Sequence, residues 1–380
     1  MKLPPRLRAL LQLALSMQIH DRAKFAGGVV GVVFATVLAG QQSGLILGLL
    51  AKSRMVIEHG GAAVWIVPPN TQQPQAGRIP EEVLYRARAV PGVSWTSPLL
   101  WTAGSLALPE GGTEQVTILG VEQPGLGGPW NVVAGDPRHL LQARTLFFED
   151  AEREKLGHLD LGSLREVNGR QIQAVGFTWG AIPFGPSYAF ASFDTAREIA
   201  GRTDRDPSMI LVGVEPGSDP AEVAKALQAR LDDVEVLTSQ AFALRAMRFV
   251  LVQTPMGMML GISALFGLLV GFAIVSITMY SAVLDNLREF GTLKAIGATT
   301  ADLGRVLILQ ALIYAGVGSA VGITALGFIG RAVRSAKVTL RYPPELLLGL
   351  LLVMAAICIA ASLLGLLRLR KLEPGIVFRG

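Results

Sequence analysis

The stretch DNLREFGTLKAIGATTADLG occupies residues 285–304 and lies between two long uncharged runs. The run before it, residues 249–284, and the run after it, residues 306–330, contain no Asp, Glu, Lys, Arg or His. A helix of ~20 apolar residues crosses the ~30 Å hydrocarbon core of a bilayer. The stretch 285–304 is therefore predicted to be a polar segment at a membrane surface, between two spans.

The composition of the whole chain favours a membrane protein. Of its 380 residues, 51% are hydrophobic and only 17% are charged. Two further uncharged runs, residues 25–51 and 346–367, are also long enough to span a bilayer. Residues 52–248 are rich in Gly, Pro and charged residues and have the size of a complete domain. We predict an integral membrane α-helical protein with four transmembrane helices and a large α+β extracytoplasmic domain between helices 1 and 2.

The order of segments follows from these boundaries. It is a cytoplasmic amphipathic helix (1–24), the first span (25–51), the extracytoplasmic domain (52–248), a stalk with the second span (249–284), a cytoplasmic segment (285–305), the third span (306–330), a short extracytoplasmic loop (331–345), the fourth span (346–367) and a cytoplasmic tail (368–380). On the N-terminal helix, Leu10, Leu13, Leu15 and Ile19 are expected to face lipid or protein.

Basic residues around the first and last spans predict the orientation, because cytoplasmic flanks carry an excess of Lys and Arg. These residues are Arg6, Arg8, Arg22, Lys24, Arg368, Arg370 and Lys371. Both termini are therefore expected in the cytoplasm and the large domain outside it. The loop 331–345 opposes this assignment, since it carries Arg331, Arg334, Lys337 and Arg341.

Short β-branched and aromatic runs within residues 52–248 predict strands. One is AAVWIV at 62–67, and another is REVNGRQIQAVGF at 165–177, where Asn168 and Gly169 predict a two-residue hairpin turn. Residues 209–240 predict a βαβ unit whose helix has Asp219 as its N-cap and Pro220 at its first position. The acidic run EDAEREK, which starts at Glu149, is interpreted as a solvated helix surface.

Residues that could support enzymatic or metal chemistry are not grouped in this sequence. His59, His139 and His158 are far apart and form no HExxH pair, and the single cysteine, Cys358, lies within the last span. The sequence contains no GxxxxGK[ST] phosphate loop and no GxSxG nucleophile motif. We expect a non-catalytic chain without catalytic, cofactor or metal residues. The net charge of +5 is attributed to membrane topology, so no nucleic-acid partner is expected.

Small residues recur at helical spacing within the spans. In lipid, such faces let helix backbones approach closely, so we expect these positions to pack against helices of the same chain or of a partner. The glycines are Gly40, Gly44, Gly48, Gly267, Gly271, Gly318 and Gly322. Gln41 and Gln42 lie mid-span, where an unpaired amide is costly, so at least one is expected to hydrogen-bond across a helix interface.

The segment 285–304 has a helical pattern of its own. Four apolar residues lie three positions apart and drift around a helix by about 60° per step. They are Leu287, Phe290, Leu293 and Ile296. A stripe that winds in this way suits a helix held by protein on more than one side, although an ordinary loop between spans accounts for the pattern equally well. Gly297 is expected to stop the helix, and Thr299 or Thr300 to cap the next one.

The sequence REFGTLKAIGAT at 288–299 resembles the cytoplasmic coupling segment of FtsX/MacB-like (type VII) ABC transporter permeases. The usual form of that segment is close to E-(I/F)-G-x-L-(K/R)-A-(I/L)-G-A-(S/T). The tail LRKLEPGIVFRG at 369–380 resembles the closing pattern of the same family, and the predicted order of spans is the family's. The resemblance implies an ATPase-coupling role for Leu287, Arg288, Glu289, Phe290, Gly291, Leu293, Lys294, Ile296, Gly297 and Thr299.

The resemblance carries further expectations about fold and partners. It implies an extracytoplasmic domain of the MacB periplasmic-core type and a separate MacB/LolD-like ABC ATPase that binds ATP and Mg²⁺. It also implies a second permease in a homodimer, a membrane-fusion adaptor and an outer-membrane channel. The chain is then expected in a bacterial inner (plasma) membrane, with its large domain in the periplasm. The missing fused ATPase and the segment FATVLAGQQSGL at 34–45 look closest to DevC-type subunits.

Two functions are consistent with this resemblance. In the first, motion driven by the partner ATPase is passed to the outer domain and exports a lipid, glycolipid or other amphiphile. In the alternative, the same motion serves an FtsX-like signalling scaffold that activates an extracytoplasmic hydrolase.

Overall fold

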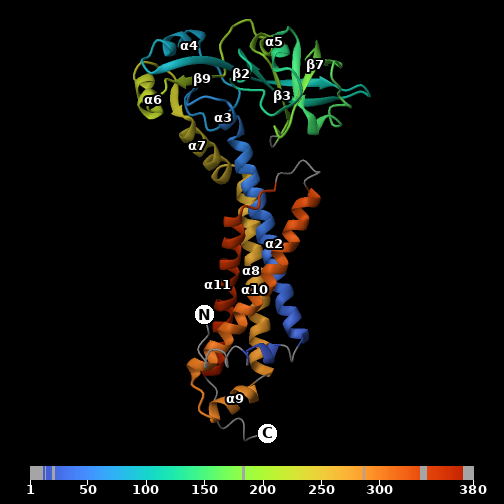
Figure 1. Cartoon of the computed structure of the whole chain (residues 1–380), viewed down its shortest axis with the longest axis vertical. Coiled ribbons are helices and arrows are strands. Elements are labelled where there is room, and N and C mark those ends of the chain that lie inside the picture. Colours follow the sequence, from blue (N-terminus) through green and yellow to red (C-terminus); the bar gives the residue numbers. More distant parts are fainter. Residues whose placement is uncertain are drawn as a thin grey trace. The chain divides into compact units, whose positions relative to one another are not determined.

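The computed structural model describes residues 12, 14–18, 22–181, 185–285, 287–333 and 340–370. The chain forms two compact units (Figure 1). The membrane unit consists of Met1–Gly48 together with Pro255–Gly380, and the sheet unit consists of Leu49–Thr254. The tail motif at 371–380 and parts of the N-terminal helix and of the loop 331–345 lie outside the described residues.

The membrane unit is a bundle of long apolar helices, and the short helix α9 lies at one end of the bundle (Figure 1). Its helices are α2 (Arg22–Ser53), α8 (Pro255–Asp285), α9 (Leu287–Ala295), α10 (Thr300–Val333) and α11 (Pro344–Arg370). Four stretches are long and apolar enough to span a membrane: Arg22–Ser53, Pro255–Thr278, Thr300–Ala332 and Pro344–Leu363. The chain is therefore a multi-pass membrane protein, and the predicted fold class is confirmed.

Glycines bring α2 close to α8 and α10. A Cβ atom added to Gly271 would overlap Ala35, and one added to Gly318 would overlap Val32. At four more of the predicted glycines, an added Cβ atom would meet a large or branched side chain. Gly40 meets Leu326 and Leu350, Gly44 meets Tyr342, Gly267 meets Leu38 and Gly322 meets Thr36, while Gly48 is buried. The small faces thus serve contacts within the chain.

The mid-span glutamines differ from the expectation. Gln42 is half-buried, and its Oε1 atom is buried without a hydrogen-bond partner among the described residues. No hydrogen bond of Gln41 across a helix interface is found in the described part of the bundle either. Glycine-mediated contacts between helices, rather than amide hydrogen bonds, account for the packing of α2 here.

The close approach of Gly271 to Ala35 predicts that a large side chain at position 271 is destabilising. We expect Gly271→Leu to lower the stability of the folded chain by about 1–3 kcal/mol, because the larger side chain must displace Ala35 from the contact between α8 and α2. Thermal unfolding of the purified chain in detergent measures this effect. Gly261→Leu on the same helix is the matched control, because no described atom lies within 4 Å of a Cβ at that position. Equal destabilisation by both variants would contradict the packing described.

The sheet unit is built on a ten-stranded sheet in the order β10-β1-β9-β2-β3-β8-β5-β7-β4, with β6 paired to β2 and β7. The strands are β1 (Val64–Val67), β2 (Val93–Ala107), β3 (Thr113–Val121), β4 (Val132–Gly135), β5 (Thr145–Glu149), β6 (Leu164–Val167), β7 (Arg170–Thr178), β8 (Ser187–Ser192), β9 (Met209–Val214) and β10 (Glu235–Thr238). Among them β2 is the longest, and it pairs with β9 over its first half and with β3 over its second half. This strand therefore joins the two halves of the sheet.

Helices cover the two ends of this sheet separately. They are α3 (Met55–His59), α4 (Glu81–Arg88), α5 (Phe193–Ile199), α6 (Pro220–Gln228) and α7 (Ser239–Val252), with short 3₁₀ turns at Pro137–Leu141 and Asp150–Glu152. In Figure 1, α4 and α6 lie at one end of the sheet and α5 at the other. Leu84 of α4 and Leu227 of α6 share one core, whereas Phe193 and Ile199 of α5 belong to another.

Local turn and cap signals from the sequence are confirmed in the sheet unit. Asn168 and Gly169, with φ angles of 49° and 76°, turn the chain between β6 and β7. Asp219 caps α6 by accepting a hydrogen bond from the N–H of Ala221 at 3.0 Å. The predicted βαβ unit is also present, with the difference that β1 lies between β9 and β10 and is antiparallel to both.

The interpretation of EDAEREK as a solvated helix surface is wrong. Glu149 ends β5 and is 0% exposed, and Glu152 lies in a 3₁₀ turn and is 3% exposed. The Glu149 carboxylate accepts hydrogen bonds from Thr178 Oγ1 at 3.0 Å and from the N–H groups of Gly180 at 2.8 Å and Ala181 at 2.9 Å. Charged residue types suggested exposure, but the backbone N–H donors after β7 provide the partners that let this carboxylate be buried.

The buried carboxylate predicts a pH dependence. Burial raises the pKa of Glu149 above its ordinary value of 4.5. A raised pKa means that the folded state retains a proton that the unfolded state releases, so this stabilising contribution is lost as pH rises through the folded pKa. We expect the free energy of unfolding of the wild type to fall, relative to that of Glu149→Gln, as pH rises above 4.5. Denaturant titrations in detergent measure both free energies, and a wild-type value that rises with pH relative to that of Glu149→Gln would contradict this expectation.

Candidate coupling site

The inner side of α9 is anchored in the core of the membrane unit. Phe290 is 1% exposed and belongs to the same buried cluster as Val283 of α8 and Leu307 of α10. Leu293, one turn along, is half-buried and packs against the same cluster. Burying a phenylalanine side chain contributes about 1.5–3 kcal/mol. The short helix is thereby fixed to the two long helices that it connects in sequence.

The outer side of α9 presents an apolar residue to solvent. Ile296, immediately after the helix, is 80% exposed, although isoleucine is among the residue types most often buried. Glu289 and Thr299 are exposed on the same short segment. The apolar stripe of the sequence therefore divides: Phe290 and Leu293 turn into the chain, and Ile296 turns away from it.

A glycine C-cap holds Ile296 in this position. The N–H of Ala298 donates to the carbonyl of Leu293 at 2.9 Å, and the N–H of Gly297 donates to the carbonyl of Lys294 at 3.1 Å. Gly297 has φ +105°, in the left-handed region that disfavours other residues. These two bonds form a Schellman motif, which satisfies carbonyl groups at the end of α9. The prediction that Gly297 stops the helix is confirmed.

The positive φ angle of Gly297 predicts that alanine at this position destabilises the end of α9. We expect Gly297→Ala to destabilise the end of α9 by about 1–2 kcal/mol, because an L-residue at this positive φ is strained. Faster hydrogen exchange at the amide of Ala298 would report the loosened cap. Gly327→Ala on α10 is the matched control, since no described atom lies within 4 Å of a Cβ there. Unchanged exchange in Gly297→Ala would contradict the prediction.

The next helix starts with a reciprocal cap. Thr299 Oγ1 accepts from the N–H of Asp302 at 3.2 Å, and the N–H of Thr299 donates to Asp302 Oδ2 at 3.3 Å. This arrangement is a capping box with Asp in place of Glu, and it identifies Thr299 as the cap of α10. The end of α9 and the start of α10 are thus both capped. Only three residues separate Ala295 from Thr299, so the turn between the two helices is short and well defined.

Other predicted coupling residues contribute in different ways. Gly291 is buried. Lys294 is half-buried and interacts with another group of the protein. The backbone of Leu287 and Arg288 belongs to α9, whereas their side chains lie outside the described part of the structure. The site therefore brings together an anchoring set inside the chain and an exposed set around Ile296.

The N-terminal segment joins the same core, a feature that the sequence reasoning did not predict. Ala14 and Met17 are buried in the cluster that contains Phe290. Gln18 Nε2 donates to the backbone carbonyl of Gln310 on α10 at 3.0 Å. Leu15 is 36% exposed, while Leu10, Leu13 and Ile19 lie outside the described residues. The small residue Ala14 one turn before Gln18 was the only sequence signal for this contact.

The exposed part of the segment around α9 is suited to binding a partner. Among the described residues, no group of three or more His, Cys, Asp or Glu side chains is placed to hold a metal ion. Between residues 289 and 299 the exposed side chains include a carboxylate (Glu289), an apolar group (Ile296) and a hydroxyl (Thr299). Such a mixed apolar and polar patch is typical of a protein-binding surface.

Comparisons with known proteins match this chain to permeases. The FtsX-like permease C-terminal family matches residues 261–374, which include α9, α10 and all of α8 except its first six residues. Two uncharacterized ABC transporter permeases of Mycobacterium tuberculosis are each 25% identical to it, over 359 and 361 residues, or 92% of this chain and 93% of each relative. The ABC transporter permease YknZ of Bacillus subtilis is 25% identical over 187 residues, 46% of this chain and 45% of YknZ.

Two solved structures resemble about half of the chain. The extracellular domain of the ABC-type transporter YknZ from Gram-positive bacteria has a TM-score of 0.35 and 16% identity, and covers 47% of this chain and 99% of that domain. The periplasmic region of MacB from Actinobacillus actinomycetemcomitans has a TM-score of 0.38 and 11% identity, and covers 48% of this chain and 92% of that region. Both TM-scores are low, so these likenesses carry no further argument here.

Proposed function

We propose that this chain, an ABC transporter permease of the FtsX/MacB type, transmits motion from a separate ATPase at α9 to its sheet unit and so drives export of a lipid, glycolipid or other amphiphile. The ATPase, of the MacB/LolD type, binds and hydrolyses ATP with Mg²⁺, and the permease contributes no catalytic residue. Two permease chains form a homodimer and bind two ATPase subunits. A membrane-fusion adaptor and an outer-membrane channel receive the cargo.

The exposed Ile296 is the observation that carries this proposal. An isoleucine that is 80% exposed gains free energy when a partner covers it, and the Schellman motif beside it keeps it from folding back onto the chain. Preorganisation of this kind lowers the entropic cost of binding. Glu289 and Thr299 are exposed polar residues of the same short segment. The ATPase is the partner that an ABC permease requires.

The proposed orientation makes this patch accessible to a cytoplasmic ATPase. Positively charged residues before the first span, including Arg22 and Lys24, favour a cytoplasmic N-terminus. Four spans then return the C-terminus to the cytoplasm, and the segment between the second and third spans lies on the same side. In this orientation α9 is cytoplasmic and the sheet unit is extracytoplasmic.

The anchoring of α9 provides the route for motion. Because Phe290 is buried with residues of α8 and α10, a push on the exposed side of α9 moves those helices instead of bending a loop. In sequence, α8 starts only two residues after the end of α7, which belongs to the sheet unit. A displacement of α8 is thereby passed along the chain into that unit.

Purification of the tagged chain from its native membrane in mild detergent tests the proposal. We expect an ABC ATPase to co-purify, with ATP hydrolysis, together with an adaptor protein. Co-purification of the ATPase with a cell-wall hydrolase instead of an adaptor would replace export by FtsX-like signalling. Absence of any ATPase would overturn the coupling role of α9.

A further inference from the structure

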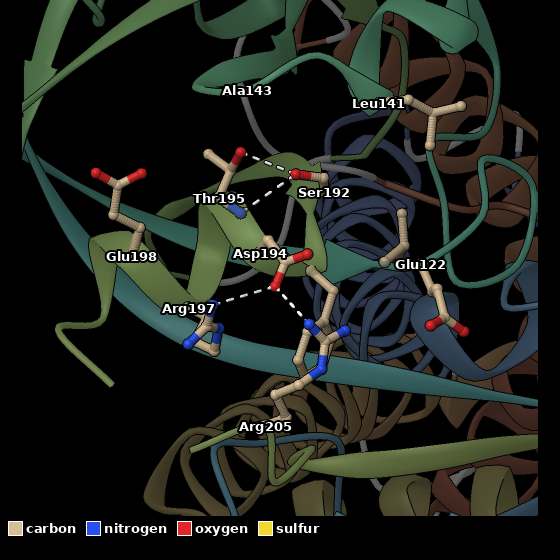
Figure 2. A pocket seen from close by; sticks show the side chains of 11 residues that line it. Glu122, Leu141, Ala143, Ser192, Asp194, Thr195, Arg197, Glu198 and Arg205 are labelled. Atoms are coloured by element: carbon tan, nitrogen blue, oxygen red, sulfur yellow. Dashed lines mark hydrogen bonds and ion pairs between the residues drawn. The ribbon is translucent and has the colours of Figure 1, made fainter. Parts of the chain in front are cut away.

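Two neighbouring pockets lie in the sheet unit where two of its cores meet. The larger, about 500 Å³, surrounds the start of α5 (Figure 2), and the smaller, about 140 Å³, is lined by residues of α4. Glu122, Phe193 and Arg205 line both pockets. Leu84 of the smaller pocket belongs to the core under α4, and Phe193 to the core under α5. Together they form one groove, here named the α4–α5 groove.

Most charges in the groove neutralise one another. Its lining contains four carboxylates against two guanidinium groups. Three of those carboxylates pair with arginines of the lining or beside it. The pairs are Asp194 with Arg205 at 2.9 Å and with Arg197 at 3.3 Å, Glu81 with Arg205 at 3.6 Å, and Glu198 with Arg144 at 2.7 Å.

Glu122 is the exception. It is exposed, and it makes no hydrogen bond or ion pair within the described residues. Figure 2 shows its carboxylate at the edge of the larger pocket, without the interactions that join Asp194 to Arg197 and Arg205. The groove therefore carries one uncompensated negative charge at the point that both pockets share, although the chain as a whole has a net charge of +5.

The groove already binds one organic cation, the side chain of Arg205. Its guanidinium lies between the Asp194 and Glu81 carboxylates and sits 5.6 Å from the ring centroid of Phe193. A cation held by carboxylates and an aromatic face is a recognised combination. Glu122 and the ring of Tyr85, which is 59% exposed, offer the same two partners in the smaller pocket.

A hydrogen bond holds Tyr85 in place beside the smaller pocket. Its hydroxyl donates to Glu81 Oε1 at 3.1 Å, which fixes the ring on the outer side of α4. Pro98 and Pro207 complete the apolar wall of the smaller pocket, and Leu141 lines the larger one. These walls suit the aliphatic or aromatic part of a ligand whose charged end meets Glu122.

We propose that the α4–α5 groove binds an organic cation, a guanidinium or ammonium group carried on a short apolar chain, with Glu122 as its counter-ion. This inference is independent of the proposed coupling at α9. The chemistry is shared by an arginine or lysine side chain of a protein partner and by a cationic amphiphile. The apolar walls formed by Pro98, Pro207 and Leu141 can receive the apolar portion of either.

Calorimetric titration of the full chain in phosphatidylcholine nanodiscs tests this. The peptide probe is the amidated, N-acetylated tetrapeptide Gly-Leu-Arg-Phe, and its neutral twin carries citrulline in place of arginine. The amphiphile probe is octylammonium, with octanol as the neutral twin. We expect at least one cationic probe to bind about two- to fivefold more tightly than its neutral twin, the difference that one partly exposed ion pair supplies.

Variants of the chain localise the effect. Glu122→Gln should remove the preference for the charged probe, and Glu122→Asp should retain most of it because it keeps the charge. Glu110→Gln, at an exposed carboxylate in the turn between β2 and β3, should leave binding unchanged. Preference for the peptide identifies a protein partner, and preference for octylammonium identifies a cationic amphiphile. Equal binding of charged and neutral twins, or an unaltered preference in Glu122→Gln, would overturn the proposal.

Discussion

Replacing Ile296 by aspartate is expected to weaken ATPase binding at least tenfold while leaving the chain folded. The side chain is 80% exposed in the isolated chain, so the substitution removes no internal packing, and such surface changes alter stability by about 0.5 kcal/mol or less. In a complex, the same position would bury a carboxylate without a partner. That costs several kcal/mol, which exceeds the ~1.4 kcal/mol that corresponds to a tenfold change in affinity.

The experiment compares ATPase co-purified with wild type, Ile296→Asp and Ile296→Val. The valine variant is the control, because it keeps an apolar surface and loses only one methylene. Leu161→Asp, at a residue of the sheet unit that is 52% exposed, controls for adding an acidic group elsewhere. Full ATPase recovery with Ile296→Asp would show that the partner does not cover this residue.

Phe290→Ala is expected to destabilise the membrane unit by about 3 kcal/mol and to uncouple α9 from it. The ring is 1% exposed, and its removal leaves a cavity in the cluster shared by α8 and α10. Phe290→Leu should recover most of the stability, because it keeps an apolar side chain of similar size. Thermal unfolding in detergent and ATP hydrolysis of the assembled complex provide the two readouts.

The charge at Glu289 is expected to matter less than this ring. Glu289 is exposed, and an exposed ion pair contributes ~0–1 kcal/mol, so Glu289→Gln should reduce ATPase binding only slightly. If Glu289→Gln abolished binding while Phe290→Ala did not, the ranking would be reversed. The pair Ile296→Asp and Phe290→Ala also separates docking from anchoring, since only the second should lower the melting temperature.

Local signals made part of the structure predictable from the sequence. Gly297, Thr299 and Asp219 act as the caps that their residue types suggest, and Asn168–Gly169 forms the expected hairpin turn. These features depend on backbone dihedral angles and on hydrogen bonds between residues a few positions apart, and the residues concerned are contiguous in the chain. Uncharged runs of spanning length likewise identified the four apolar helices, because bilayer thickness sets their length.

Features that depend on distant residues were not predictable. Phe290 and Ile296 belong to one apolar stripe in the sequence, yet the cluster formed with α8 and α10 decides that the first is buried and the second exposed. Glu149 looked solvated until the N–H groups of Gly180 and Ala181, some thirty positions away, supplied its partners. The uncompensated charge of Glu122 emerges only when the strands of the sheet bring α4 and α5 to one groove.

Site-specific photo-crosslinking at position 296 in living cells tests the central claim most directly. A photoreactive amino acid in place of Ile296 should crosslink to an ABC ATPase, and the same group in place of Phe290 should crosslink only within the chain. Crosslinks from position 296 to lipid alone, or an ATPase crosslink from position 290 and none from 296, would contradict the account of α9 as the ATPase-coupling site.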